Sequence, residues 1–76
     1  MDANKIRAKL STEARGRLEY YGAAYKNALS KQDPYLVNYV TGQIMGYVDA
    51  LAGFKIITDD ERQPIVKYYI GLTKEV

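Results

Sequence analysis

Residues 33–54, DPYLVNYVTGQIMGYVDALAGF, constrain the fold more than any other stretch, because they predict one long helix with two uncharged faces. Apolar residues recur at spacings of three and four and gather into one wide stripe, as in an amphipathic helix. This stripe comprises Val37, Val40, Ile44, Tyr47 and Leu51, flanked by Leu36, Val48 and Phe54. A second row on the opposite side comprises Tyr35, Tyr39, Gly42, Gly46, Ala50 and Gly53. Two such faces predict two neighbours for this helix.

The ends of this central helix are marked by residues that commonly cap helices. Asp33 can accept hydrogen bonds from free backbone N–H groups, and Pro34 suits the first helical position because no intrahelical bond is lost there. At the other end, Gly53 is expected to adopt the left-handed conformation, with Phe54 folding back onto Val48. The sequence therefore predicts a helix over 33–53.

A first long helix is predicted near 12–31. Ser11 or Thr12 can cap its N-terminus, and Glu13 adds a favourable acid to its first turn. Its inward stripe is predicted to comprise Leu18, Tyr21, Tyr25, Ala28 and Leu29. The preceding residues allow a short extra helix over 3–9.

A third helix is predicted near 59–74, following a capping box formed by Thr58 and Glu61. Pro64 removes a backbone hydrogen bond, so we expect a kink or a first turn that restarts at Gln63. Between the last two helices, two isoleucines, Ile56 and Ile57, are expected to close one end of the bundle. Such short connectors favour antiparallel neighbours, so the expected fold is all-α: one antiparallel three-helix bundle over 1–76.

Composition argues against several function classes. The sequence contains no histidine, no cysteine and no glycine-rich phosphate loop, so we expect a non-catalytic protein without cofactor or small-molecule substrate. Helix capping already accounts for Asp59, Asp60 and Glu61, so we expect no metal site. Asp49 and other polar residues argue against a membrane span over 36–54. Without cysteines or a signal-like N-terminus, the expected location is the cytoplasm.

The glycine side of the central helix is the main candidate binding site. Glycine destabilises a helix interior, so two glycines one turn apart predict close approach of another backbone. Two alternatives explain this: the protein's own first or third helix fills the groove, or a protein partner does, including a second copy in a homodimer. The candidate partner-binding residues are Tyr35, Tyr39, Gly42, Gly46, Asp49 and Ala50. The two tyrosines would be rigid anchors, and Gly46→Leu is expected to weaken self-association or to unfold the chain.

Asp49 is expected either to pair across such an interface with a basic residue such as Arg17 or Lys26, or to be exposed. The alternative function is nucleic-acid binding by the basic first third, where residues 1–31 hold seven Lys or Arg against three Asp or Glu. The candidate residues for it are Lys5, Arg7, Lys9, Arg15, Arg17 and Tyr20. A helix-turn-helix is disfavoured, because three acidic residues open the helix that would read the bases.

Overall fold

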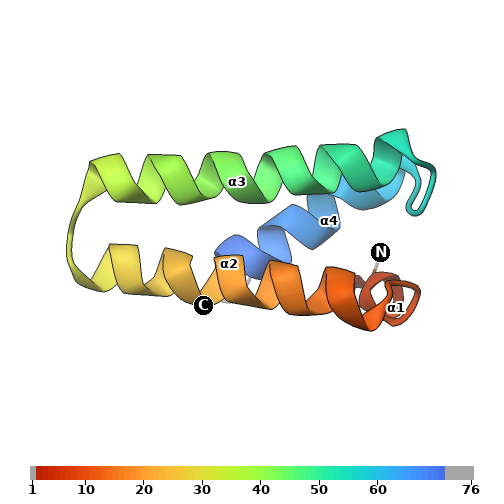
Figure 1. Ribbon diagram of the computed structural model, residues 1–76, viewed down its shortest axis with the longest axis horizontal. Coiled ribbons are helices and arrows are strands. Elements are labelled where there is room, and N and C mark those ends of the chain that lie inside the picture. The colour runs from red at the N-terminus through yellow and green to blue at the C-terminus, as the bar shows by residue number, and fades with distance from the viewer. Residues whose placement is uncertain (1, 72–76) are drawn as a thin grey trace.

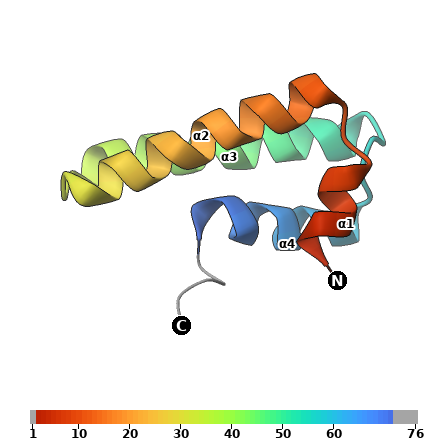
Figure 2. The same cartoon turned by 90° about the horizontal axis from the view of Figure 1, so that it is seen from below.

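Two long antiparallel helices form the frame of the molecule (Figure 1). The structure is a computed structural model that describes residues 2–71. Along the chain it contains α1 (Ala3–Ala8), α2 (Thr12–Ser30), α3 (Pro34–Gly53) and α4 (Asp59–Ile70), with no strand in the described part. α2 and α3 make a hairpin, and α1 and α4 lie together on one side of it (Figure 2). The predicted all-α bundle is confirmed, and the optional helix over 3–9 is present as α1.

The helices begin where the capping residues predict. The hydroxyl of Ser11 accepts a backbone N–H from the first turn of α2 (3.0 Å). The carboxylate of Asp33 accepts two N–H groups in the first turn of α3 (3.1 and 3.2 Å). At α4, the N–H of Thr58 donates to the carboxylate of Glu61 (2.9 Å), as in a capping box. Each start is fixed by residues within one turn, which explains why the sequence predicts it well.

A single hydrophobic core joins all four helices. Its fully buried side chains include Ile6 from α1, Leu18 from α2, Ile44 and Val48 from α3, and Ile65 from α4. The apolar stripes of α2 and α3 therefore face a common interior, and α1 completes it by contributing Ile6. Both α2 and α4 pack against the same half of α3, which leaves its other half to solvent.

The C-terminal end of α3 differs from the prediction. α3 runs through Gly53, and Lys55 adopts the left-handed conformation instead (φ 62°). The N–H of Ile56 then bonds to a carbonyl in the last turn of α3 (2.9 Å), so the chain reverses through a Schellman motif. Because this motif lies two residues later than expected, Phe54 is 79% exposed. The predicted contact of Phe54 with Val48 is wrong.

Two further apolar side chains lie outside the core. Ile57 closes the end of the bundle at 3% exposure, but Ile56 is 46% exposed, so only half of that prediction is confirmed. Leu29 is 50% exposed, and its predicted place on the inward stripe is wrong. The reason is length: α4 has 12 residues and α2 has 19, so the far end of the hairpin extends beyond α4.

α4 is one uninterrupted helix despite Pro64, so the predicted restart at Gln63 is wrong. The carbonyl that Pro64 deprives of a donor belongs to Asp60, an exposed residue of the first turn where water can replace the bond. The helix ends at Ile70, because Gly71 is left-handed (φ 78°), so the predicted continuation through Gly71 is wrong as well. The remainder of the predicted helix, 72–74, lies outside the described residues.

Candidate functional site

The exposed side of α3 is the candidate site, and we refer to it as the outer face. It consists of all exposed residues between positions 35 and 53: Tyr35, Asn38, Tyr39, Gly42, Met45, Gly46, Asp49, Ala50 and Gly53. They recur at spacings of three and four along one side of the helix. All six predicted partner-binding residues therefore share one exposed surface, together with two that the sequence analysis did not single out, Asn38 and Met45.

The outer face carries almost no charge. Solvent-facing sides of helices usually carry charged residues. In contrast, Asp49 is the only charged residue of α3, and its carboxylate accepts a hydrogen bond from Arg62 of α4 (3.0 Å). Asp49 is exposed, as the second of its two predicted alternatives states, and its pairing across an interface with Arg17 or Lys26 stays a prediction. Instead of charges, the outer face exposes the rings of Tyr35 (87%) and Tyr39 (65%).

The glycines of the outer face are open to solvent. A Cβ atom added at Gly42 or at Gly46 would meet no atom within 4 Å. The alternative in which the protein's own helices fill this groove is therefore wrong, since α2 and α4 both pack on the opposite side of α3. The structure also gives no steric reason for Gly46→Leu to unfold the chain. Among residues 2–71 nothing packs against Gly42 or Gly46, so the predicted close approach of another backbone now rests on association between chains.

Close backbone approach occurs at another glycine, Gly22 of α2. There an added Cβ would lie 3.2 Å from Cδ1 of Tyr69 and 3.5 Å from its backbone oxygen, so α4 crosses α2 at this point. Gly22 was not among the predicted contact residues. The available signal was its place between Leu18 and Tyr25, one turn from each on the inward side of α2.

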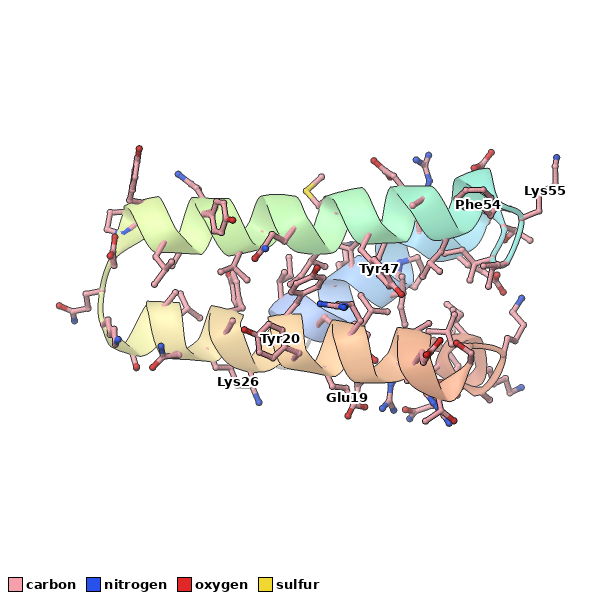
Figure 3. All side chains as sticks on the ribbon, in the orientation of Figure 1. Glu19, Tyr20, Lys26, Tyr47, Phe54 and Lys55 are labelled. Atoms are coloured by element: carbon pink, nitrogen blue, oxygen red, sulfur yellow. The ribbon has the colours of Figure 1, made fainter. Side chains whose placement is uncertain are left out.

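A second aromatic surface lies on the side of the hairpin that α4 leaves uncovered. Tyr47 points from α3 toward α2, where the ring centroid of Tyr21 lies 6.1 Å away, and Tyr20 follows at 6.0 Å from Tyr21 (Figure 3). The guanidinium of Arg17 lies 6.0 Å from the ring centroid of Tyr21. Only Tyr20 is strongly exposed, at 68%, so this cluster mainly supports the packing of the hairpin.

The structure does not gather the six nucleic-acid candidates into one site. Arg7 donates from Nε to the hydroxyl of Tyr69 (2.8 Å) and also forms an ion pair with Glu19. The hydrogen bond that Arg7 donates to Tyr69 raises the pKa of Arg7 above its ordinary value. Lys9 pairs with Glu61 of α4 (2.7 Å). The remaining four candidates are Lys5 on α1 and Arg15, Arg17 and Tyr20 on α2. Arg7 and Lys9 thus connect helices within the fold.

The Lys9–Glu61 pair predicts a pH dependence of stability. The ammonium of Lys9, followed by the N–H of Thr58, lowers the pKa of Glu61 below its ordinary value of 4.5. A lowered folded-state pKa adds stability above pH 4.5 that is lost as the pH falls through the folded pKa. We expect wild type to have a higher Tm than Glu61→Gln at pH 7, and we expect this Tm difference to shrink at a pH below 4.5. Thermal unfolding followed by circular dichroism tests this, and an equal Tm difference at both pH values would contradict it.

Within the described residues, no helix combines the length and apolarity needed to cross a membrane. The same part of the chain holds no group of three or more acidic, histidine or cysteine side chains placed to bind a metal. Comparison with known proteins finds no family model that matches the chain, and no similar curated protein or solved structure.

Proposed function

We propose that the protein is a non-catalytic interaction module that binds a protein partner through the outer face of α3. One observation carries this proposal: the face of α3 between positions 35 and 53 is exposed, rich in aromatic and small residues, and nearly free of charge. The centres of protein interfaces are depleted of charged residues and enriched in Tyr, Phe and Met. The exposed sides of α2 and α4 carry acidic and basic residues, and α1 carries basic ones, so the outer face differs from the exposed sides of the other helices.

Tyr35 and Tyr39 are the expected anchors of this contact. A tyrosine ring contributes a large apolar area through few rotatable bonds and keeps a hydroxyl for a hydrogen bond. Both rings lie one turn apart on the same side of α3 and are largely exposed in the single chain. A partner that covers them would therefore gain more from these two residues than from any others on the outer face.

The opposite side of α3 supports this role by holding the helix rigid. Val40, Ile44 and Val48 are at most 3% exposed and fix α3 in the core. A helix that is already folded loses little conformational entropy on binding, so its contact area converts more fully into affinity.

Site-specific photo-crosslinking tests the proposal. A photoreactive residue at Asn38, on the outer face, is expected to give covalent protein adducts in cells that naturally express the chain. The matched control is Asn27, an exposed asparagine on α2, which is expected to give none. Gly46→Leu should reduce the adducts from Asn38 because it fills the groove. Adducts that are equal from both positions, or unchanged by Gly46→Leu, would contradict an interface on α3.

The alternative, nucleic-acid binding through the basic first third, has weaker support. Arg7 and Lys9 already have carboxylate partners in the chain, and phosphates would have to compete with Glu19 and Glu61 for them. Phosphate contacts release bound counterions, so genuine binding must weaken steeply as salt rises. A titration with labelled single-stranded nucleic acid at two salt concentrations separates this alternative from the proposed function.

A further inference from the structure

We infer that the partner is a second copy of this chain, docked with its α3 antiparallel to the first and a twofold axis near residue 44. The inference rests on the proposed function, because it assigns an occupant to the same outer face. A twofold pair requires one surface that is complementary to itself. The distribution of large and small residues along α3 meets this requirement.

The outer face has large side chains at its N-terminal end and small ones at its C-terminal end. Tyr35 and Tyr39 are 87% and 65% exposed, whereas Gly46, Ala50 and Gly53 leave the helix backbone nearly bare. A parallel pair would place each tyrosine beside its own copy and leave the small residues facing each other across a gap. An antiparallel pair places each tyrosine against a small residue, so both ends are filled at once.

One antiparallel register satisfies all of these contacts. With the axis near residue 44, Tyr35 lies opposite Gly53 of the second copy, and Tyr39 lies within one residue of the position opposite Ala50 of the second copy. Gly42 and Gly46 flank the axis, where the absence of side chains lets the two helix backbones approach closely. Antiparallel packing also aligns the two helix dipoles favourably.

The edge of the outer face near α4 fits the same register. A twofold axis brings the same edge of both faces together, so Asn38 lies within one residue of the position opposite Asp49 of the second copy. The carboxylate of Asp49 accepts one hydrogen bond from Arg62 (3.0 Å) and retains lone pairs for the amide of Asn38. The only charge of the face therefore stays at the rim with hydrogen-bond partners, and no charge is buried at the centre.

Phe54 gives the register a second aromatic contact. Its ring lies at the end of α3 and is 79% exposed (Figure 3). In the antiparallel pair this ring meets the N-terminal end of the other α3, where a shallow hollow of about 520 Å³ lies. The hollow is lined by Asp33, Tyr35, Leu36, Asn38 and Tyr39. Each copy would thus insert one ring beside the tyrosines of the other.

The area of these rings suits a dimer contact. A phenylalanine or tyrosine buries roughly 150–250 Å² when fully covered, so Tyr35, Tyr39 and Phe54 together expose on the order of 450 Å². Each partner in a stable interface contributes about 800 Å². The rings alone therefore supply about half of that area, and the remainder of the 20-residue helix lies between them.

Disulfide formation between two single-cysteine chains tests the register, because the natural sequence has no cysteine. Chains carrying Asn38→Cys and Asp49→Cys are mixed in a glutathione buffer. The proposed register brings residue 38 of one copy close to residue 49 of the other. The same residue in the two copies lies at least about 13 Å apart along the helix axis, which is too far for a disulfide. The mixed disulfide is expected to dominate, with Asn27→Cys as the unreactive control. If disulfides between two Asn38→Cys chains and between two Asp49→Cys chains dominate instead, as in a parallel dimer, the inference is overturned.

Sedimentation equilibrium tests whether the partner on the outer face is a second copy of this chain. Wild type is expected to form dimers in a concentration-dependent manner, and Gly46→Leu to raise the dissociation constant roughly 10- to 100-fold by overfilling the groove. Gly16→Leu is the matched control, since Gly16 is an exposed glycine of α2 with no atom within 4 Å of an added Cβ. The control should dimerise like wild type.

The two proposals fail in different ways. If wild type sediments as a monomer up to about 1 mM, the second copy is excluded as the occupant. In that case, adducts of Asn38 with a different protein would retain the proposed function, and a lack of any adduct would remove it as well. If wild type dimerises but Gly46→Leu dimerises equally well, the dimer uses another surface and the inference is overturned.

Discussion

Gly22→Leu is expected to destabilise the fold by about 3 kcal/mol and to lower the Tm by roughly 12–24 °C. A Cβ at this position would already lie 3.2 Å from the ring of Tyr69 and 3.5 Å from its backbone oxygen. The remaining atoms of leucine would have to displace α4 from α2, because a backbone oxygen cannot move aside like a side chain. Tyr69 also accepts the hydrogen bond from Arg7, so this displacement would strain the attachment of α1. Thermal unfolding followed by circular dichroism measures the effect.

The same substitution at Gly16, also on α2, is the control for this experiment. Gly16 has no atom within 4 Å of an added Cβ, and leucine favours the helix over glycine, so Gly16→Leu should leave the Tm unchanged or raise it slightly. If Gly22→Leu and Gly16→Leu had similar Tm values, α2 and α4 would not approach as closely as the structure shows. Together with Gly46→Leu, this pair separates a glycine needed for folding from one proposed for association.

The sequence could not distinguish these glycines. Gly16, Gly22, Gly42 and Gly46 all lie in helix interiors, and helix propensity penalises each of them equally. What separates Gly22 is the position of α4, which depends on contacts between residues more than 40 positions apart in the chain. Periodicity identifies which residues share a helix face, but it does not show which neighbour covers that face. For this reason the sequence left two alternatives open for the glycine side of α3: it is covered by the protein's own helices, or it is covered by a partner.

Helix starts were predictable and helix ends were less so, for a local physical reason. Ser11 and Asp33 cap through their own side chains, so residue type determines the position. The ends of α2 and α3 instead depend on left-handed residues, and here these are Gln32 and Lys55 (φ 54° and 62°), which have no intrinsic preference for that conformation. Their backbone hydrogen bonds and the packing beyond them fix these turns, so sequence patterns pointed to Gly53 instead.

The candidate site was predictable in its composition but not in its full extent. The row from Tyr35 to Ala50 follows from helical spacing alone, and its residues do share one exposed face. Phe54 was predicted to fold back onto Val48 because it follows the expected cap at Gly53. Its exposure follows from the late reversal of the chain at Lys55, which no spacing rule contains. The structure therefore adds Phe54 to the proposed contact, besides Asn38 and Met45.

Leu18→Ala is expected to lower the free energy of unfolding by about 3–4 kcal/mol, within the 2–5 kcal/mol range of buried leucines. Leu18 is 0% exposed and lies in the core that joins α2 to the other helices, so the deletion leaves a cavity that rigid helices fill only partly. A domain of this length is stable by only about 4–11 kcal/mol, so this single change would remove a large share of the total. Urea unfolding followed by circular dichroism measures it through the midpoint at constant m-value.

Leu29→Ala is the matched comparison, because both leucines were predicted on the same inward stripe of α2. Because Leu29 is 50% exposed, its truncation removes less buried apolar area. We expect the free energy of unfolding to fall by at most about 1 kcal/mol. Dimer formation would add a concentration-dependent contribution to the stability, so both substitutions are best compared in the Gly46→Leu background. If both substitutions lower the free energy of unfolding equally, α4 or a further segment must cover the end of the hairpin where α2 connects to α3. Such a result would also reduce the solvent-exposed area available to the outer face, because Leu29 lies beside the N-terminal end of α3.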